Sequence, residues 1–301
     1  MTSVVALVGP TASGKSELAM RLALQWDAEI VSVDSMQVYR GMDIGTAKPT
    51  PAEQAVVPHH MIDVAEPADE YDVATFQVAA RSAISGIQAR GKRAIIVGGS
   101  GLHLRVTVDP YTFGGHDVEV RADLEAAEPG DLVARLLEVD PDAGEVVDLA
   151  NPRRVIRALE IHAVDGATPT DRARAPERRA VEAYEPLIPF VGIGVDPGED
   201  LADRARLRVD GMLVEGLLDE VEELAPHLGR TAGQAVGYKE LLPVVLGTED
   251  LWGAQEEIVR NTVALARRQR TYFRRDPRIT WLPWHPDVDE RYTALEEALD
   301  A

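Results

Sequence analysis

Residues 9–16 have the types and spacing of a phosphate-binding loop. They read Gly9, Pro10, Thr11, Ala12, Ser13, Gly14, Lys15 and Ser16, which fits the pattern G-x-x-x-x-G-K-[ST]. In such a loop the backbone N–H groups turn toward an anion, the lysine adds a positive charge, and the Ser16 hydroxyl suits Mg²⁺. The sequence therefore predicts a di- or triphosphate site with Ser16 as a metal ligand. The pattern leaves open whether the phosphates are a phosphoryl donor or a leaving group.

Asp34 is a carboxylate that we expect beside this loop. It follows the apolar segment 28–33, which is predicted to be a strand. Residues just beyond the carboxyl end of a strand line the ligand crevice of an open α/β sheet, so Asp34 could act there as a catalyst. Aspartate is also a common N-cap residue of helices. The local pattern does not decide between these two interpretations.

A third predicted strand, residues 93–97, is followed by glycines and Ser100 rather than by an aspartate. P-loop enzymes that transfer phosphoryl groups often place an acidic residue at such a strand end to hold Mg²⁺. Here the Ser100 hydroxyl and backbone N–H groups would face the crevice, where they could donate hydrogen bonds to an anionic oxygen. The alternative is a tight turn that simply requires glycine.

Arginines mark two further candidate sites. Arg153 and Arg154 lie in the first turn of a predicted helix, where positive charge opposes the helix dipole and indicates an anionic partner. Arg204 and Arg208 lie one turn apart in a helix predicted over 203–224, and such a pair can clamp a diphosphate. A solvated helix face or a surface ion pair is the alternative in each case.

A basic face is predicted for the helix over residues 256–275. At about 100° per residue, six arginines fall on one arc, opposite an apolar face. These are Arg260, Arg267, Arg268, Arg270, Arg274 and Arg275. Because the chain has a net charge of -20, this concentration favours binding of an RNA backbone over a merely solvated face.

Composition limits the remaining possibilities. The absence of cysteine excludes disulfides and thiolate zinc sites, so oxygen ligands and Mg²⁺ are expected. The net charge of -20 argues against nonspecific nucleic-acid binding by the whole surface. No apolar run reaches the roughly 20 residues of a membrane span, and no cationic signal region is visible. We therefore expect a cytoplasmic protein without membrane contact, and a monomer.

The chain alternates strand and helix patterns except between residues 114 and 189, where short helical segments rich in Arg, Glu and Asp are broken by prolines. This texture predicts an α/β fold of the P-loop NTPase class, with a parallel sheet core and an inserted helical subdomain. The core would span 1–113 and 190–301, and the insertion 114–189. The adjacent His59 and His60, expected in a loop, favour packing or hydrogen bonding over metal binding.

Several stretches together resemble the tRNA dimethylallyltransferases. They are GPTASGKS at 9–16, DSMQVYRGMDIGTAKP at 34–49, VPHH at 57–60, VGGSGL at 97–102, NPRRVIRALE at 151–160, QAVGYKE at 234–240 and RRQRTYFRRD at 267–276. The resemblance implies a nucleotide-kinase-like core with a helical insertion. It also implies transfer of a dimethylallyl group from dimethylallyl diphosphate, with Mg²⁺, to N6 of the adenosine 3′ to the anticodon. The partner is then the anticodon stem–loop of tRNA.

The resemblance also implies residue roles. Asp34 would be the general base, residues 11–16 would hold the diphosphate together with Arg208, and Ser100 would act near the adenosine. The implied tRNA contacts are Asp34, Ser35, Met36, Gln37, Ser100, Arg121, Arg153, Arg154, Val155, Ile156 and Arg157, to which the basic face adds Arg267, Arg270 and Arg274. Two departures stand out: Ser100 replaces the usual threonine, and His103 replaces the usual tyrosine.

Three other functions share some of these features. A small-molecule or nucleotide kinase using ATP would need the loop and Mg²⁺ but not the basic helix. A prenyltransferase acting on free AMP or ATP would not need that helix either. In a non-catalytic P-loop RNA-binding protein, Asp34 would be only a cap.

Overall fold

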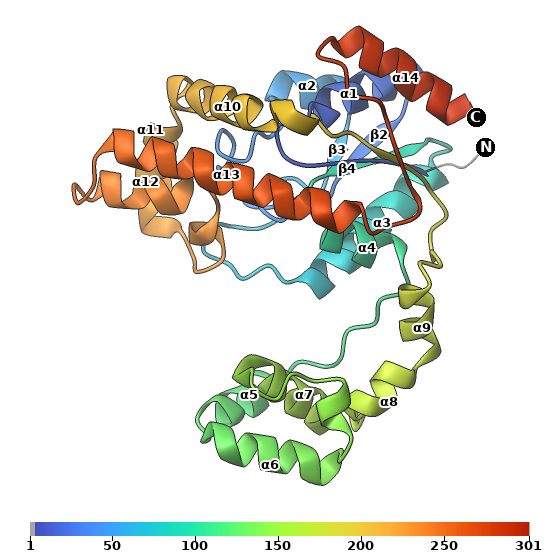
Figure 1. Cartoon of the computed structure of the whole chain (residues 1–301), viewed down its shortest axis with the longest axis vertical. Helices are drawn as coiled ribbons and strands as arrows, with labels where there is room; N and C mark the ends of the chain where they lie inside the picture. Colours follow the sequence, from blue (N-terminus) through green and yellow to red (C-terminus); the bar gives the residue numbers. More distant parts are fainter. Residues whose placement is uncertain (1–3, 301) are drawn as a thin grey trace. The chain divides into compact units, whose positions relative to one another are not determined.

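The computed structural model describes residues 4–300 (Figure 1). The chain divides into two compact units. One unit, the core, is formed by the chain up to Val108 and from Ile188 onward, and Asp109–Leu187 form the other, the helical unit. No helix within residues 4–300 is long and apolar enough to cross a membrane.

The core contains a parallel sheet of six strands in the order β3-β2-β4-β1-β5-β6. The strands are β1 (Val4–Val8), β2 (Glu29–Ser32), β3 (His59–His60), β4 (Ala94–Gly98), β5 (Val191–Gly194) and β6 (Ile279–Trp281). The expected α/β class with a parallel sheet is confirmed. The loop expected at His59 and His60 is wrong, because both residues pair with β2. Their ring nitrogens form hydrogen bonds of 2.7 Å, to the Val57 carbonyl oxygen and to Glu29 respectively.

The helices of the core are α1 (Lys15–Trp26), α2 (Pro51–Val56), α3 (Val73–Ala89), α4 (Gly101–Val108), α10 (Leu201–Glu215), α11 (Leu217–Leu224), α12 (Tyr238–Val245), α13 (Leu251–Phe273) and α14 (Val288–Asp300). Helices cover both faces of the sheet, whereas α11 and α12 pack against each other and against α10 and α13 (Figure 1). Helices α1 and α14 lie side by side and share one hydrophobic cluster with the sheet, in which Leu7, Leu18 and Leu295 are fully buried. This packing fixes the start of α1 relative to β1.

The single helix expected over 203–224 is wrong, because α10 and α11 are separate helices. Gly216 between them has a φ of 106°, a left-handed conformation that glycine tolerates and that interrupts a right-handed helix. The break between the helices allows two of their side chains to reach different places. Arg208 of α10 lines the cavity beside residues 9–16, whereas Glu220 of α11 binds the loop at Ile44.

The helical unit has its own hydrophobic core. Its helices are α5 (Val118–Glu125), α6 (Pro129–Val139), α7 (Pro152–Asp165), α8 (Pro169–Arg174) and α9 (Pro176–Glu182). Four of them begin with proline, whose missing N–H costs nothing in a first turn. Leu124, Leu136 and Val155 are among the residues buried where α5, α6 and α7 meet. The tRNA-contacting role expected for residues 114–189 stays a prediction.

Candidate active site

The phosphate-binding loop lies between β1 and α1, so the predicted order of strand, loop and helix is confirmed. Two positions in the loop are left-handed: Ala12 has a φ of 62° and Gly14 a φ of 83°. Gly9 has no room for a side chain, because a Cβ there would lie 2.1 Å from the Val195 carbonyl oxygen. The backbone therefore needs these small residues to turn and to pass close to the strand end.

Side chains from distant parts of the chain hold the loop. Arg204 Nε donates to the Ala12 carbonyl oxygen at 2.7 Å, and Arg291 of α14 donates to the Ser13 carbonyl oxygen at 3.3 Å. Gln269 of α13 accepts the Thr11 N–H at 2.8 Å. The expected diphosphate clamp of Arg204 and Arg208 is therefore wrong as a pair, because Arg204 is engaged by the backbone of the loop. Arg208 alone lines the cavity described next.

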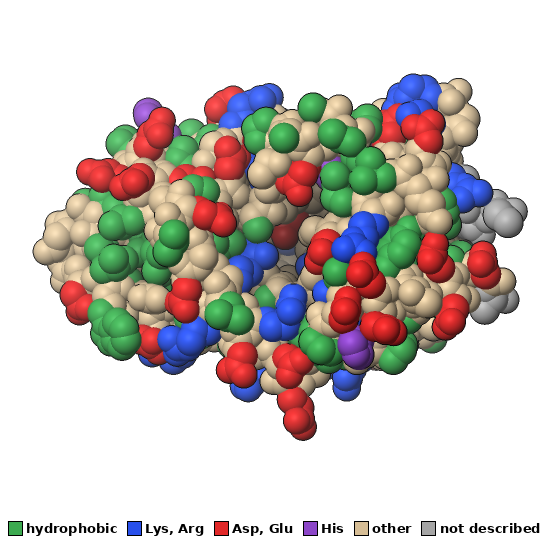
Figure 2. Space-filling model, turned by 90° about the horizontal axis from the view of Figure 1, so that it is seen from above, with side chains coloured by type: hydrophobic (Ala, Val, Ile, Leu, Met, Phe, Trp, Pro, Cys, Tyr) green, Lys and Arg blue, Asp and Glu red, His purple; other side chains and the backbone are tan. Residues whose placement is uncertain are grey.

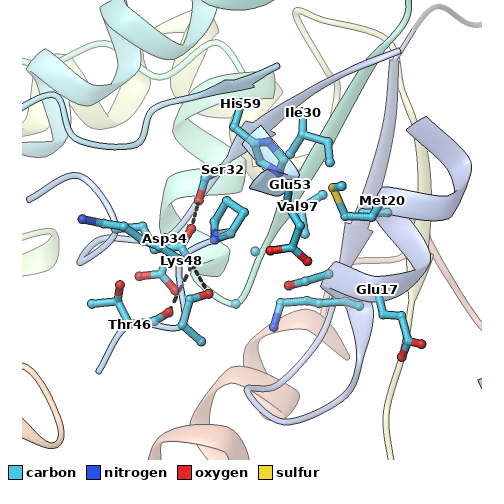
Figure 3. A pocket seen from close by; sticks show the side chains of 18 of the residues that line it. Glu17, Met20, Ile30, Ser32, Asp34, Thr46, Lys48, Glu53, His59 and Val97 are labelled. Carbon is cyan, nitrogen blue, oxygen red and sulfur yellow. Dashed lines mark hydrogen bonds between the residues drawn. The ribbon is translucent and has the colours of Figure 1, made fainter. Parts of the chain in front are cut away.

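A cavity of about 330 Å³ lies beside the loop. Lys15, Ser16, Asp34, Arg208 and Gln269 are among its polar lining residues. Its apolar lining includes Met20, Leu24, Ile30 and Val97, three of which gather on one side in Figure 3, away from Asp34, Thr46 and Lys48. Glu53 and His59 lie on the same side as these apolar residues (Figure 3). The cavity thus joins cations, the Asp34 carboxylate and a largely apolar side.

The electrostatics of this cavity suit an anion. Burial lowers the pKa of Lys15 to about 8, with a further decrease from the neighbouring charge of Arg208 and an opposing increase from Asp34. Burial also lowers the pKa of Arg208. Two cations held together with little solvent are strained, and a bound diphosphate would relieve that strain. On the face shown in Figure 2, several Lys and Arg side chains lie around a central hollow, in which an Asp or Glu side chain is also visible.

Asp34 does not cap a helix, so that interpretation is wrong. No helix follows it, and its Oδ1 accepts the Met36 N–H at 2.9 Å in a turn two residues long. This hydrogen bond fixes the carboxylate while Asp34 remains half-buried in the cavity lining. The arrangement leaves Oδ2 for a substrate.

The segment after Asp34 is folded by its own polar side chains. Gln37 accepts the Ser32 hydroxyl at 2.7 Å and donates to the Thr46 and Ala47 carbonyl oxygens at 3.1 and 3.2 Å. Its amide is therefore occupied within the protein, which limits the base contact expected for it. Met36 and Ser35 are half-buried neighbours of Asp34.

Lys48 anchors the end of this segment. Its side chain is only 2% exposed, and its ammonium group lies 2.7 Å from Asp43 and 2.6 Å from Asp63. Its Nζ also donates to the Tyr39 carbonyl oxygen at 2.5 Å. Lys48 therefore links the backbone at Tyr39 to the side chains of Asp43 and Asp63, and these contacts hold the loop in place.

Glu220 of α11 is a residue that the sequence analysis missed. Its carboxylate accepts the backbone N–H groups of Asp43, Ile44 and Gly45 at 2.7 to 3.1 Å. It also accepts the Tyr238 hydroxyl at 2.5 Å. No local pattern could identify this contact, because Glu220 lies about 175 positions from the loop that it holds.

Ser100 and His103 form a pair at the end of β4. Ser100 Oγ lies 2.7 Å from His103 Nδ1, and the His103 ring meets the Phe76 ring edge on with centroids 4.5 Å apart. The cavity lining reaches Gly98 and Gly99, and Ser100 is half-buried immediately beyond them. Burial lowers the pKa of His103, and the charge of Asp34 opposes this decrease.

Helix α13 has the two faces that its sequence predicts. Phe273 and Ala266 are buried, whereas Arg267 and Arg274 are exposed. Arg270 and Arg274 differ from Arg267, because both donate to Asp196, at 2.6 and 3.2 Å. The Arg270 side chain is 22% exposed and that of Arg274 is 63% exposed. The RNA contact expected for each therefore competes with an internal ion pair, most strongly at Arg270.

In the helical unit the predicted tRNA-contacting residues are not equivalent. Arg153 and Arg154 are exposed at the start of α7. Val155 and Ile156 are 1% and 8% exposed and pack in the core of the unit, so a tRNA contact there would have to use their backbone, and it stays a prediction.

Arg157 and Arg121 are engaged within the helical unit. Arg157 donates to the Gly114 and Gly115 carbonyl oxygens, each at 2.8 Å, and to buried Glu160 at 2.7 Å. Arg121 lies 2.9 Å from Glu125 and 3.4 Å from Glu160. Both arginines thus form hydrogen bonds with Glu160 inside the helical unit. Their contact with RNA stays a prediction.

Comparisons with known proteins agree on one family. The model of a family described as IPP transferase matches residues 37–276, and one described as isopentenyl transferase matches residues 2–66. A tRNA dimethylallyltransferase of Bifidobacterium longum is 47% identical over 289 residues, covering 93% of this chain and 86% of the relative, and that of Thermobifida fusca is 45% identical, covering 98% and 94%.

Solved structures show the same likeness. The crystal structure of a tRNA isopentenylpyrophosphate transferase from Bacillus halodurans has a TM-score of 0.69 and 36% identity, covering 99% of this chain and 98% of that chain. A eukaryotic dimethylallyltransferase acting on tRNA has a TM-score of 0.80 and 25% identity, covering 100% of this chain and 80% of that chain. The described fold is therefore that of these enzymes.

Proposed function

The chain belongs to the family of tRNA dimethylallyltransferases, and we propose that it transfers the dimethylallyl group in the cavity beside residues 9–16. One observation carries this proposal: a single cavity joins the cations of the loop, the Asp34 carboxylate and a largely apolar side. The acceptor is N6 of the adenosine 3′ to the anticodon. A kinase would use the loop and cations but has no need of the largely apolar side.

The diphosphate is held by Lys15, Arg208 and the N–H groups of the loop. These groups stabilise the negative charge that develops as the bond between the allylic carbon and the diphosphate oxygen breaks. Mg²⁺ fits here, because it binds few protein oxygens together with phosphate oxygens, and the Ser16 hydroxyl and the Asp34 carboxylate both line the cavity. When bound, the ion would neutralise further charge on the leaving group.

Asp34 is the general base. As the adenine N6 attacks the allylic carbon, one proton of the amine passes to Oδ2, because Oδ1 is held by the Met36 N–H. The apolar side of the cavity, with Met20, Ile30 and Val97, holds the dimethylallyl group and excludes water from the reacting carbon. The products are the N6-dimethylallyl adenine, diphosphate and a proton on the carboxylate.

The tRNA must present its adenine to a site beside the sheet. A base in a stacked anticodon loop cannot reach this cavity, so the nucleotide is extruded. Exposed arginines position the backbone, namely Arg267 of α13, Arg274 directly after it, and Arg153 and Arg154 of α7. The protein acts in the cytoplasm as a monomer.

The experiment is incubation of the protein with dimethylallyl diphosphate, Mg²⁺ and unmodified tRNA, followed by mass analysis of the nucleosides. Asp34→Asn keeps the acceptor oxygen for Met36 but removes the base, so kcat should fall by about 10²- to 10⁴-fold while affinity for tRNA changes little. Asp219→Asn, on the exposed surface of α11, is the matched control. Retained turnover in Asp34→Asn would exclude Asp34 as the base, and product formation only with ATP as donor would favour a kinase.

A further inference from the structure

His103 and Ser100 make a hydrogen bond for which the proposed function gives no use. Ser100 Oγ lies 2.7 Å from His103 Nδ1 and 3.5 Å from the His103 backbone nitrogen, which it approaches as the residue before α4. A serine hydroxyl has one hydrogen to donate and two lone pairs to accept. The direction of the short hydrogen bond therefore decides what Ser100 can offer to a substrate.

Two observations indicate that Ser100 donates and His103 accepts in this 2.7 Å hydrogen bond. Burial lowers the pKa of His103, so its ring is neutral near pH 7. The ring also lies in the first turn of α4, where the helix dipole disfavours positive charge. Ser100 then keeps a lone pair that no hydrogen bond within the pair uses.

The pair lies immediately beyond Gly98 and Gly99, which line the cavity together with Asp34. Strand β4 is the neighbour of both β1 and β2, so the segment after it emerges between the phosphate-binding loop and Asp34. The charge of Asp34 reaches His103, and it is the charged group that affects the pKa of this imidazole. Phe76 of α3 contacts the ring edge on, and Tyr272 of α13 lies close to Gly101 at the start of α4.

We propose that His103 is a positioning residue that fixes the Ser100 hydroxyl as a hydrogen-bond acceptor for the substrate amine. The inference rests on the proposed function. The adenine amine has two hydrogens: Asp34 takes one as the bond to carbon forms, and Ser100 holds the other throughout. Two acceptors on opposite sides of the amine fix its plane relative to the allylic carbon, which a single base cannot do.

Protonation of His103 would reverse this arrangement. An imidazolium Nδ1–H donates to Ser100 Oγ and occupies the lone pair meant for the amine, so kcat should fall at acidic pH. His103→Asn places an amide oxygen near the position of Nδ1, and it accepts the same hydrogen bond but does not titrate. His103→Leu removes the acceptor and keeps an apolar contact with Phe76.

The test measures kcat and KM for tRNA and for dimethylallyl diphosphate between about pH 5.5 and 8.5. We expect His103→Leu to lower kcat about five- to tenfold, with KM for the diphosphate unchanged. His103→Asn should keep the rate at neutral pH and lose the part of the acidic decrease that His103 causes. In a Ser100→Ala background, His103→Leu should have no further effect, because the hydroxyl that it positions is already gone.

Two results would overturn the inference: an unchanged kcat in His103→Leu, or an acidic decrease in His103→Asn identical to that of the unmodified protein. A thermal melt checks folding, and if His103→Leu does not fold, the pH profile of His103→Asn still decides. Failure of the proposed function is distinguishable, because the unmodified protein would then make no prenylated tRNA. Failure of this inference alone leaves an active protein whose rate does not depend on His103.

Discussion

Raising the pH from about 7 to 9 should weaken the binding of dimethylallyl diphosphate by removing the charge of Lys15. In the free protein, burial and Arg208 lower the pKa of Lys15 to about 8. A bound diphosphate stabilises the ammonium form and raises this pKa. The affinity that the charge contributes is therefore fully present below pH 8 and is lost as the pH rises through that value.

The magnitude follows from linkage. If the pKa of Lys15 in the complex lies well above 9, the charged fraction of the free protein sets the apparent affinity, which falls roughly tenfold between pH 7 and 9. Binding should take up about half a proton at pH 8 and close to one at pH 9. The diphosphate itself is nearly fully ionised in this range and adds little.

Isothermal titration calorimetry measures both quantities, because repeating the titration in buffers of different ionisation enthalpy gives the number of protons taken up. Lys15→Gln should bind weakly at every pH, with a flat profile near the high-pH limit of the unmodified protein. Arg208→Gln removes one cause of the low pKa, so the decrease in affinity should begin at a higher pH. An affinity of the unmodified protein that stays constant from pH 7 to 9, without proton uptake, would refute this reasoning.

Two further predictions concern other parts of the chain. Gly98→Ala should lower the free energy of unfolding by about 1 to 3 kcal/mol in urea denaturation, because its Cβ would lie 2.5 Å from the Val33 carbonyl oxygen. Gly86→Ala in α3 should not destabilise, because Gly86 is half-buried and its Cβ would meet only the end of the Arg90 side chain, at 3.5 Å. Arg267→Gln combined with Arg274→Gln should weaken tRNA binding and reduce its salt dependence. An unchanged slope of affinity against salt concentration would exclude both arginines from the tRNA contact, leaving Arg267 solvated and Arg274 paired with Asp196.

Residues close together in sequence could be predicted well. The residue spacing at 9–16 predicts a phosphate-binding loop. The strand and the helix predicted on either side of it are present as β1 and α1. The two faces of α13 follow from helical periodicity. Asp34 was expected at the edge of the sheet, and the structure places it in the cavity beside Lys15. Each of these inferences depends on regular backbone geometry, such as helical periodicity and the position of a residue at a strand end, which is the same in all proteins.

Residues far apart in sequence could not be assigned in this way. Arg204 and Arg208 are one turn apart and look alike, yet one holds the loop backbone from Ala12 and the other lines the cavity. Arg270 and Arg274 look like Arg267 in the sequence, but both pair with Asp196, 74 and 78 positions away. Val155 lies between arginines and is buried. Burial and partner choice depend on which elements pack against a side chain, and the sequence of one helix does not contain that information.

The sequence by itself determined the chemistry that this protein can do: a phosphate-binding loop, a carboxylate after a neighbouring strand, and a basic helix. The tertiary structure decided which groups do it. Gln269 reaches Thr11 and Glu220 reaches the loop at 43–45 only because the parallel sheet brings its carboxyl edge against α13 and α11. The physical reason is that hydrogen bonds and charge pairs act over a few ångströms in space, regardless of the hundreds of residues between their partners.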